Sequence, residues 1–556
     1  MSFKTPSSKV STIVEGLGKL DGFQYANGVE QFCGIPYATL PKRWTRSSLR
    51  TSWDNDYHDG TKLGNMCPRP VTGHDSSPFN PFIPVPPNPA FTTAGVDEKT
   101  ALVLNIAIPQ HPTPEGKKFP VLAWIHGGSL IYGSANYGIY DGVNLISHSI
   151  AIGCPIVMVS FNYRLGLGGF LASSKIAEEL KQDGFAGNGN FGFTDQKVAM
   201  DWIQRYIAQF GGDPDNVTAV GQSAGAISIG HHMAANDPMK FNRAVCMSGL
   251  GSTLRPRSLE EHERLFDATC RYLSIDPQTP DALDQLRKVD QQTLANADSI
   301  IQGVPAGTGN PRNDGWFYAH SPNEVTKSPD WLKSFLLGDV HDEGVVFVEN
   351  LQHDTYETVR STLLEHIPNG TFVDTVLELY HIHPGASRQD FINRVCHMGS
   401  DAVFRIQNYE TALVDGRLQE EKALVKYHFD QRSRLHNILQ GKAYHGVDVL
   451  YLFGNLENKP NEQERAMAFD VQSAWVRFIH GQVPWQSEYG VWKVWGPDSQ
   501  ENVETELQDE PIRHYSRFKL LLALGSVDHL WDSYMLAMDY LLMKRDNVGR
   551  TNTGNK

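Results

Sequence analysis

One serine stands in a pattern that is typical of a catalytic nucleophile. The segment VTAVGQSAGAIS, residues 217–228, contains the pentapeptide GQSAG, which fits G-x-S-x-G. That pattern indicates a sharp turn from a β-strand into an α-helix, in which the flanking glycines avoid clashes. The start of the helix directs backbone N–H groups towards the serine, where they can stabilise an oxyanion. Ser223 is therefore a candidate nucleophile, and the alternative is a polar residue in an ordinary turn.

A serine hydroxyl becomes a useful nucleophile only when a base accepts its proton. His445 lies in a glycine-flanked loop within GKAYHGVDVLYLFG, residues 441–454. The segment LLGDVHDEGVVF, residues 336–347, offers three carboxylates to orient such a histidine. These are Asp339, Asp342 and Glu343, and the residues alone do not decide among them. The order serine, acid, histidine is that of α/β-hydrolases.

An oxyanion needs hydrogen-bond donors, and a glycine pair upstream of Ser223 could supply them. The segment WIHGGSL, residues 124–130, follows an apolar run, and its glycines allow the backbone to approach a substrate closely. A simple turn is the alternative interpretation. The presence of GQSAG about a hundred residues downstream favours an oxyanion loop.

Short apolar runs alternate with helical patterns along the chain. This alternation predicts an α/β fold with a large, mostly parallel central sheet, helices on both faces and long lid or insertion loops. Active sites of such sheets lie at the carboxyl ends of strands, where the candidate residues stand. A helix is expected at 194–210, with Thr194 as its N-cap and Gly211-Gly212 at its end. The expected buried strands are 119–128, 155–165, 217–221, 334–340 and 423–429.

The bulk composition excludes several classes of partner. The chain has 556 residues, 40 % of them hydrophobic, and a formal net charge of −14, which argues against nucleic acid or an anionic membrane. There is no run of about 18 apolar residues that would span a membrane, and the first residues do not resemble a signal peptide. Six cysteines without a CxxC pair argue against a zinc site. We expect a cytoplasmic protein with no metal and no cofactor.

No repeat or linker divides the chain, so residues 1–556 are expected to form one domain. Residues 67–96 are rich in proline and phenylalanine, which suggests either a lid loop or a surface wrap. Residues 514–545 are predicted to form one apolar C-terminal helix. It is expected to pack on the body through Leu530, Tyr534, Ala537 and Leu541. The oligomeric state is not predicted.

Several of these blocks resemble one family. The stretch GNFGFTDQKVAMDWIQRYIAQFGGDPDNVTAVGQSAG, residues 189–225, is similar to the signature of type-B carboxylesterases, the α/β-hydrolases that include fungal lipases and cholinesterases. Further matching blocks follow in the family's order, and the resemblance extends over essentially the whole chain. They are FCGIPYA (32–38), FNYRLGLGGFL (161–171), VCMSGLGS (245–252), DEGVVF (342–347) and YHGVDVLYLFG (444–454).

The resemblance assigns roles to individual residues. It implies Ser223 as nucleophile, His445 as base and Glu343 as the acid, because the family's acid is the glutamate of its D-E-G block. It also implies oxyanion donors from the backbone N–H groups of Gly128, Ser129 and Ala224. Ser248 would place a hydroxyl near the triad. Arg164 and Asp195 match positions that usually form a structural ion pair.

The chain also departs from the family pattern. Gln222 replaces the glutamate that commonly precedes the serine, and no tryptophan lies in residues 67–96, so a neutral ester is expected rather than a cationic one. Ser129 replaces the third glycine of the oxyanion loop. Cys67 corresponds to the first cysteine of a family disulfide, but Ala101 occupies its partner position. That bridge cannot form, as expected in a reducing compartment.

Three functions follow as hypotheses. The first is a serine carboxylic-ester hydrolase that acts through an acyl-enzyme on a neutral, fairly apolar small-molecule ester. The second is an acyltransferase, or a lactonising or cyclising enzyme of specialised metabolism, that uses the same triad. The third is a non-catalytic binding module, which would normally have lost the triad residues.

Overall fold

The computed structural model describes ten stretches of the chain. They are residues 5–71, 95–110, 117–298, 300–301, 304, 306–319, 328–418, 423–455, 461–486 and 488–543. Of the predicted lid loop at 67–96, residues 72–94 lie outside the described residues.

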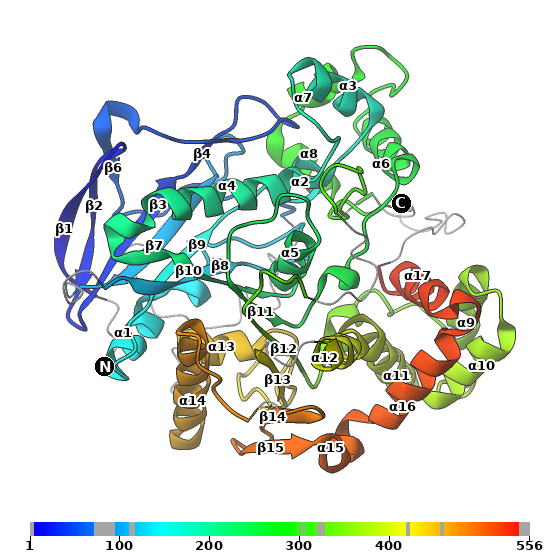
Figure 1. Cartoon of the computed structure of the whole chain (residues 1–556). Coiled ribbons are helices and arrows are strands. Elements are labelled where there is room, and N and C mark those ends of the chain that lie inside the picture. Colours follow the sequence, from blue (N-terminus) through cyan, green and yellow to red (C-terminus); the bar gives the residue numbers. More distant parts are fainter. Residues whose placement is uncertain are drawn as a thin grey trace.

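A large sheet runs through the described part of the molecule (Figure 1). Its strands are β1 (Pro6–Val14), β2 (Gly18–Tyr25), β3 (Val29–Pro36), β6 (Tyr57–Asp59), β7 (Val103–Pro109), β8 (Phe119–Ile125), β9 (Val157–Phe161), β10 (Gly212–Gln222), β11 (Arg243–Met247), β12 (Ser334–Val340), β13 (Ala423–Phe429), β14 (Val491–Trp495) and β15 (Glu501–Thr505). Two short strands, β4 (Ala38–Thr39) and β5 (Ser48–Leu49), pair separately.

The centre of the large sheet is parallel. Strands β9, β8, β10, β11, β12, β13 and β14 lie side by side in that order, and each neighbouring pair is parallel. Antiparallel strands extend both edges, through β7, β3, β2 and β1 on one side and β15 on the other. The five predicted buried strands are confirmed as β8, β9, β10, β12 and β13, although β10 begins earlier, at Gly212.

Helices cover both faces of this sheet, because alternate side chains of its central strands enter two different cores. In β8, Val121, Ala123 and Ile125 belong to the core that also contains side chains of α4 and α5. Leu122 and Trp124 belong to the opposite core, with side chains of α1, α13 and α14. These helices span Val143–Ala151 (α1), Phe191–Tyr206 (α4), Ala224–Met233 (α5), Val447–Phe453 (α13) and Glu462–Ile479 (α14).

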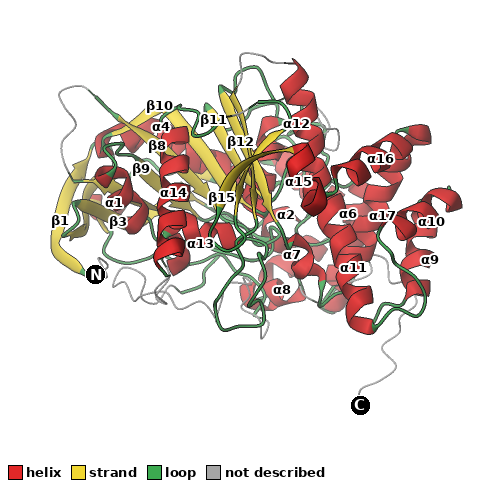
Figure 2. Cartoon of the chain, turned by 90° about the horizontal axis from the view of Figure 1, so that it is seen from below, coloured by secondary structure: helices red, strands yellow, loops and turns green. Residues whose placement is uncertain are grey.

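Further helices gather beside the carboxyl half of the sheet. Figure 2 shows α9, α10, α11, α16 and α17 as a helical lobe on the far side of α12 and α15 from the strands. The bounds are α9 (Tyr356–His366), α10 (Gly370–Leu379), α11 (Arg388–Ser400), α12 (Ile406–Leu418), α15 (Glu506–Arg513), α16 (Tyr515–Gly525) and α17 (Leu530–Met543). The remaining helices are α2 (Gly166–Phe170), α3 (Ser174–Gln182), α6 (Leu259–Tyr272), α7 (Ala282–Lys288) and α8 (Gln291–Ala297). Among the described residues, no helix has the length and apolar character needed to cross a bilayer.

The helix expected at 194–210 begins earlier than predicted. Helix α4 starts at Phe191 with Asn190 as its N-cap, so the prediction of Thr194 as N-cap is wrong. The Thr194 hydroxyl lies inside the helix and donates to the carbonyl of Phe191 at 2.9 Å. Gly192 belongs to the first turn, where a Cβ would lie 2.5 Å from the Arg164 carbonyl oxygen. The early glycine thus serves close packing rather than marking a loop.

The single helix predicted at 514–545 is also wrong, because the chain forms two helices there. Helix α16 ends at Gly525, and Asp528 and His529 adopt positive φ angles of 50° and 57° before α17 begins. A Cβ on Gly525 would lie 2.9 Å from that of Trp531, so the glycine allows the two helices to approach. The four predicted packing residues, Leu530, Tyr534, Ala537 and Leu541, are all buried.

Candidate active site

Ser223 occupies the turn between β10 and α5, as its pattern predicts. Its backbone is strained, with φ 56° and ψ −125°, and its N–H donates to the Met247 carbonyl at 2.8 Å. A Cβ on Gly221 would overlap the backbone of Gly225, and a Cβ on Gly225 would overlap the Ile125 carbonyl. Both glycines are therefore required by space, which explains their spacing around the serine.

The candidate base and one of the three candidate acids are in direct contact. His445, in the loop between β13 and α13, forms a short hydrogen bond through Nδ1 to Glu343 Oε2. Glu343 is fully buried, and His445 is 5 % exposed. The second carboxylate oxygen, Oε1, accepts from the Val340 N–H at 2.9 Å. These contacts fix both the carboxylate and the imidazole ring.

The other two carboxylates of that segment have different partners. Asp339 contacts His428 Nδ1 at 2.8 Å and Asn408 Nδ2 at 3.0 Å, away from His445. Although burial opposes its charge, His428 and then the more distant Arg513 hold the pKa of Asp339 well below its usual value. The third carboxylate, Asp342, accepts from the Ala443 N–H at 2.9 Å and so holds the loop that carries His445.

The glycine loop after β8 has an unusual backbone conformation and lies close to the neighbouring backbone. Gly128, Ser129 and Leu130 have successive positive φ angles of 115°, 57° and 60°. A Cβ on Gly128 would overlap the Tyr132 carbonyl, whereas Ser129 is exposed. Within the described part of the chain, the N–H groups of Gly128 and Ser129 have no acceptor. Ala224 is the first residue of α5, so its N–H also lacks a partner inside the helix.

Gln222 is buried beside His445 rather than directed into solvent. Its side chain is 1 % exposed, and its Nε2 lies 3.1 Å from His445 Nε2. Among the contacts of the described residues, Ser223 Oγ and His445 Nε2 do not form a hydrogen bond with each other; the partner of His445 Nε2 is Gln222. The neighbour of the serine therefore contacts the candidate base directly.

Ser248 lies at the end of β11, close to the nucleophile turn. Its N–H donates to the Gly338 carbonyl at 2.9 Å, and a Cβ on the following Gly249 would lie 2.9 Å from the Ser223 carbonyl oxygen. The Ser248 hydroxyl is buried and has no hydrogen-bond partner among the described residues. Its expected role beside the triad stays a prediction.

Two residues of the site were missed by the sequence analysis. A π-helical turn, Asp401–Arg405, interrupts the long helix between α11 and α12. From this turn, the Phe404 ring lies 5.0 Å from the His445 ring. The Arg405 guanidinium donates to the carbonyl of His341, next to the candidate acid. The helical pattern of 350–440 carried no signal that would distinguish these two side chains.

Two supports implied by the resemblance have clear geometry. Arg164 and Asp195 form a buried bidentate ion pair, with Nε–Oδ2 at 2.7 Å and Nη2–Oδ1 at 2.8 Å. Cys67 is buried and free, and Ala101, at the position of the second cysteine in the family pattern, is also buried. The ion pair stands where predicted, and no disulfide forms at Cys67.

The parallel sheet, the strained serine turn after a central strand, and the acid and histidine at later strand ends define the α/β-hydrolase class. A PNB esterase of known structure has this fold, with a TM-score of 0.70 and 23 % identity over 92 % of this chain and 99 % of that chain. The model of the carboxylesterase family matches residues 6–519, and the chain belongs to that family.

Relatives within the family include esterases and lipases. Lipase 3 of Yarrowia lipolytica is 31 % identical over 484 residues, which cover 84 % of this chain and 88 % of the lipase. The para-nitrobenzyl esterase of Bacillus subtilis is 27 % identical over 520 residues, 89 % of this chain and 95 % of that enzyme. The chain is accordingly a serine carboxylic-ester hydrolase.

Proposed function

We propose that the chain hydrolyses neutral, fairly apolar carboxylic esters through an acyl-enzyme on Ser223, with His445 as general base and Glu343 as the acid that orients it. The observation that carries this proposal is the buried contact between Glu343 and His445 Nδ1, next to the strained turn of Ser223. A carboxylate in this position keeps the proton on Nδ1 and stabilises the imidazolium that forms during the reaction.

In the proposed acylation, Ser223 Oγ attacks the ester carbonyl carbon while its proton moves to His445 Nε2. The carbonyl oxygen becomes an oxyanion that accepts hydrogen bonds from the N–H groups of Gly128, Ser129 and Ala224. When the intermediate collapses, the bond to the alcohol oxygen breaks, and His445 returns its proton to that oxygen. The alcohol leaves, and the acyl group remains on Ser223.

Deacylation repeats these steps with water. His445 takes a proton from water, whose oxygen attacks the acyl carbon, and the bond to Ser223 Oγ then breaks. The carboxylic acid is released and the serine recovers its proton. The preference for a neutral ester is supported by Gln222, whose amide carries no charge to attract a cationic group beside the nucleophile.

A fluorophosphonate probe tests the nucleophile. We expect one adduct, located at Ser223 by mass spectrometry, and none in Ser223→Ala. Activity lost equally in Ser223→Ala, His445→Ala and the double variant would support one cooperating unit, because effects of such residues do not add. An unlabelled Ser223 in the folded wild type would contradict the proposal. Product analysis with an added alcohol distinguishes hydrolysis from acyl transfer, since transfer would yield the new ester instead of the acid.

We also propose that the enzyme works in the cytoplasm. All six cysteines are free, and five of them are buried, which is the usual condition of thiols in a reducing compartment. Fractionation of the producing cells should find the activity with cytosolic markers, and recovery in the medium would contradict this assignment.

A further inference from the structure

The side chain of Gln222 contacts His445 Nε2, the nitrogen that would have to accept the proton of Ser223. Gln222 Nε2 lies 3.1 Å from His445 Nε2, while His445 Nδ1 faces Glu343. Both side chains are at least nine-tenths buried. The imidazole therefore has a partner on each of its two nitrogens in the absence of substrate.

The direction of this second hydrogen bond follows from the first. A neutral imidazole that donates from Nδ1 to a carboxylate has a bare Nε2, which can only accept. The amide NH₂ of Gln222 is a donor, so it matches that lone pair. A carboxylate in the same place would set two acceptors against each other, unless the imidazole were protonated.

Packing holds the amide where it is. A Cβ on Gly127 would lie 3.0 Å from Gln222 Oε1, 2.7 Å from the Gln222 carbonyl oxygen and 3.0 Å from Ser223 Cβ. The backbone carbonyl of Gln222 thus requires glycine at position 127, and this glycine lets the loop of Gly128 pack closely against the amide. On the other side, the Phe404 ring packs against the His445 ring. The amide is enclosed between the glycine loop and the imidazole.

We propose that Gln222 is a positioning residue that donates its amide hydrogen to His445 Nε2 in the free enzyme, so that Ser223 gains this lone pair only by displacing the amide. This inference rests on the proposed roles of Ser223 and His445. One sp² lone pair accepts one strong hydrogen bond, so the amide and the serine hydroxyl compete for it. Substrate binding, which brings the serine into attack, has to release Gln222.

Other charged and titratable groups also surround His445. Glu343 contacts it directly, and Asp448 of α13 lies near both residues and hydrogen-bonds to the Tyr427 hydroxyl at 2.7 Å. Burial, together with the charge of Glu343, raises the pKa of Asp448 to about 6. Arg405, on the π-helical turn, donates to the His341 carbonyl, and Lys442 lies 3.7 Å from Asp342. Variants at position 222 leave all of these groups in place, so differences among the variants report on Gln222.

Two substitutions separate donation from charge. Gln222→Met keeps the length of the side chain but removes the hydrogen-bond donor. Without that donor, the unprotonated form of the imidazole loses its stabilising hydrogen bond. The acidic limb of the pH profile of kcat/KM should move to higher pH by about 0.5–1 unit, the equivalent of one hydrogen bond. Gln222→Glu places a negative charge at Nε2, and the same limb should move up by about 1–3 units. Hydrolysis of 4-nitrophenyl butyrate, followed at the isosbestic wavelength, gives the profile.

Gln196→Met is the matched control. Gln196 is another fully buried amide, and its side chain contacts Ser228 Oγ at 3.0 Å and His232 Nε2 at 3.1 Å rather than His445. The control should lose stability but leave the acidic limb at the wild-type position. If Gln222→Met stays within about 0.2 pH unit of wild type, the proposal is overturned.

A readout without substrate distinguishes this inference from the proposed function. The ¹⁵N resonance of His445 Nε2, assigned with His445→Ala, should move downfield in Gln222→Met because the lone pair loses its donor. An unchanged resonance would overturn the contact even in an active enzyme. Conversely, the resonance could move in Gln222→Met while the wild type fails to react with the fluorophosphonate. That result would contradict the proposed function and not the contact.

Discussion

At the scale of single residues, position rather than type decides what a carboxylate does. Asp339, Asp342 and Glu343 lie within five residues of one another, yet each has a different partner. Glu343 contacts His445, Asp342 holds the backbone of the next loop, and Asp339 enters a separate charge network. Only the first of these contacts involves His445, the proposed base.

Replacing two of these carboxylates by amides tests that assignment. Glu343→Gln should reduce kcat by about 10³–10⁴-fold, because an amide stabilises neither the correct tautomer nor the imidazolium. Asp342→Asn should cost less than about tenfold, since the new side chain still offers an oxygen to the Ala443 N–H. Steady-state kinetics on a neutral aryl ester measure both losses, and the reverse ranking would transfer the acid role to Asp342.

At the scale of elements, the turn that carries Glu343 depends on a neighbouring helix. The Gly344 N–H donates to Ser400 Oγ at 2.7 Å, and that hydroxyl donates to the Cys396 carbonyl at 2.9 Å. A Cβ on Gly344 would overlap the same carbonyl. The end of α11 and the turn after β12 thus approach as closely as the backbone allows, and this contact positions the carboxylate.

Gly344→Ala should therefore damage both stability and activity. The added methyl group has no room, so the turn and α11 must separate, at a cost of about 1–3 kcal/mol. Kcat should fall while the unfolding midpoint decreases. Gly370→Ala is the control, because a Cβ there meets only Leu364 at 3.8 Å, and its midpoint should equal or exceed that of the wild type. A stable, fully active Gly344→Ala would show that the contact is not needed.

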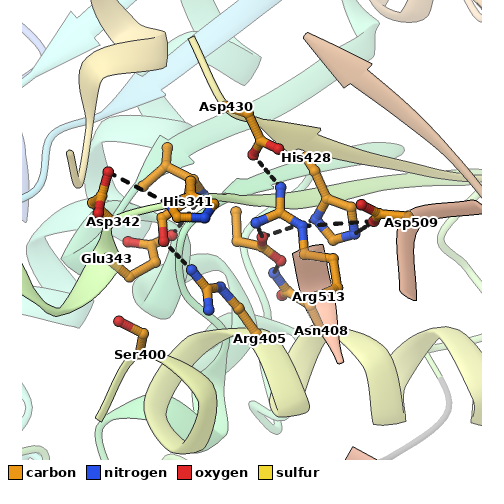
Figure 3. A network of polar contacts seen from close by, with 12 residues as sticks. His341, Asp342, Glu343, Ser400, Arg405, Asn408, His428, Asp430, Asp509 and Arg513 are labelled. Atoms are coloured by element: carbon orange, nitrogen blue, oxygen red, sulfur yellow. Dashed lines mark hydrogen bonds and ion pairs between the residues drawn. The ribbon is translucent and has the colours of Figure 1, made fainter. Parts of the chain in front are cut away.

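At the scale of the whole molecule, a buried charge network joins the C-terminal helices to the sheet (Figure 3). Arg513, at the end of α15, is fully buried and pairs with Asp430 after β13. It also lies 3.6 Å from Asp509 and 4.0 Å from Asp339 at the end of β12. The last part of the chain is thereby attached to the same strand ends that carry the site.

Arg513→Met should destabilise the protein by about 3–5 kcal/mol, because it leaves buried carboxylates without their cation. The pKa of Asp339 is lowered by the fold, so its contribution is present above about pH 4 and is lost as the pH falls. The deficit of the variant, measured by urea unfolding, should therefore be nearly constant from neutral pH down to about pH 5 and should shrink only as the pH falls below about 4. Arg360→Met, which breaks an exposed pair with Asp374, should change stability by less than about 1 kcal/mol.

The absence of disulfides among the six cysteines can be tested by alkylation. Alkylation of the denatured, unreduced protein should modify all six cysteines, because Cys67 has an alanine at its expected partner position and the structure contains six free thiols. Reductant should leave the unfolding midpoint unchanged. Fewer than six modifications in the intact mass would reveal a disulfide and contradict the assignment to a reducing compartment.

Much of the architecture could be predicted from local pattern. Continuous apolar runs identified five parallel strands, since a strand buried on both faces needs apolar side chains throughout. The antiparallel margins were not predicted, because half-exposed strands such as β1 and β15 mix polar and apolar residues. The division of 514–545 into two helices also escaped prediction, because it depends on a close approach between Gly525 and Trp531.

For the site, the sequence by itself determined where the turn of Ser223 must lie, since only glycines fit at positions 221 and 225. It also placed His445 after a strand and three carboxylates at or just after the end of another, where parallel topology gathers side chains at one edge. Family resemblance named Glu343, but the residues left the choice open. The tertiary structure alone decided which carboxylate contacts His445, that Phe404 packs on its ring, and that Gln222 faces its Nε2. Those are contacts between segments up to 223 residues apart, and their distances depend on how helices and loops pack, which no local pattern encodes.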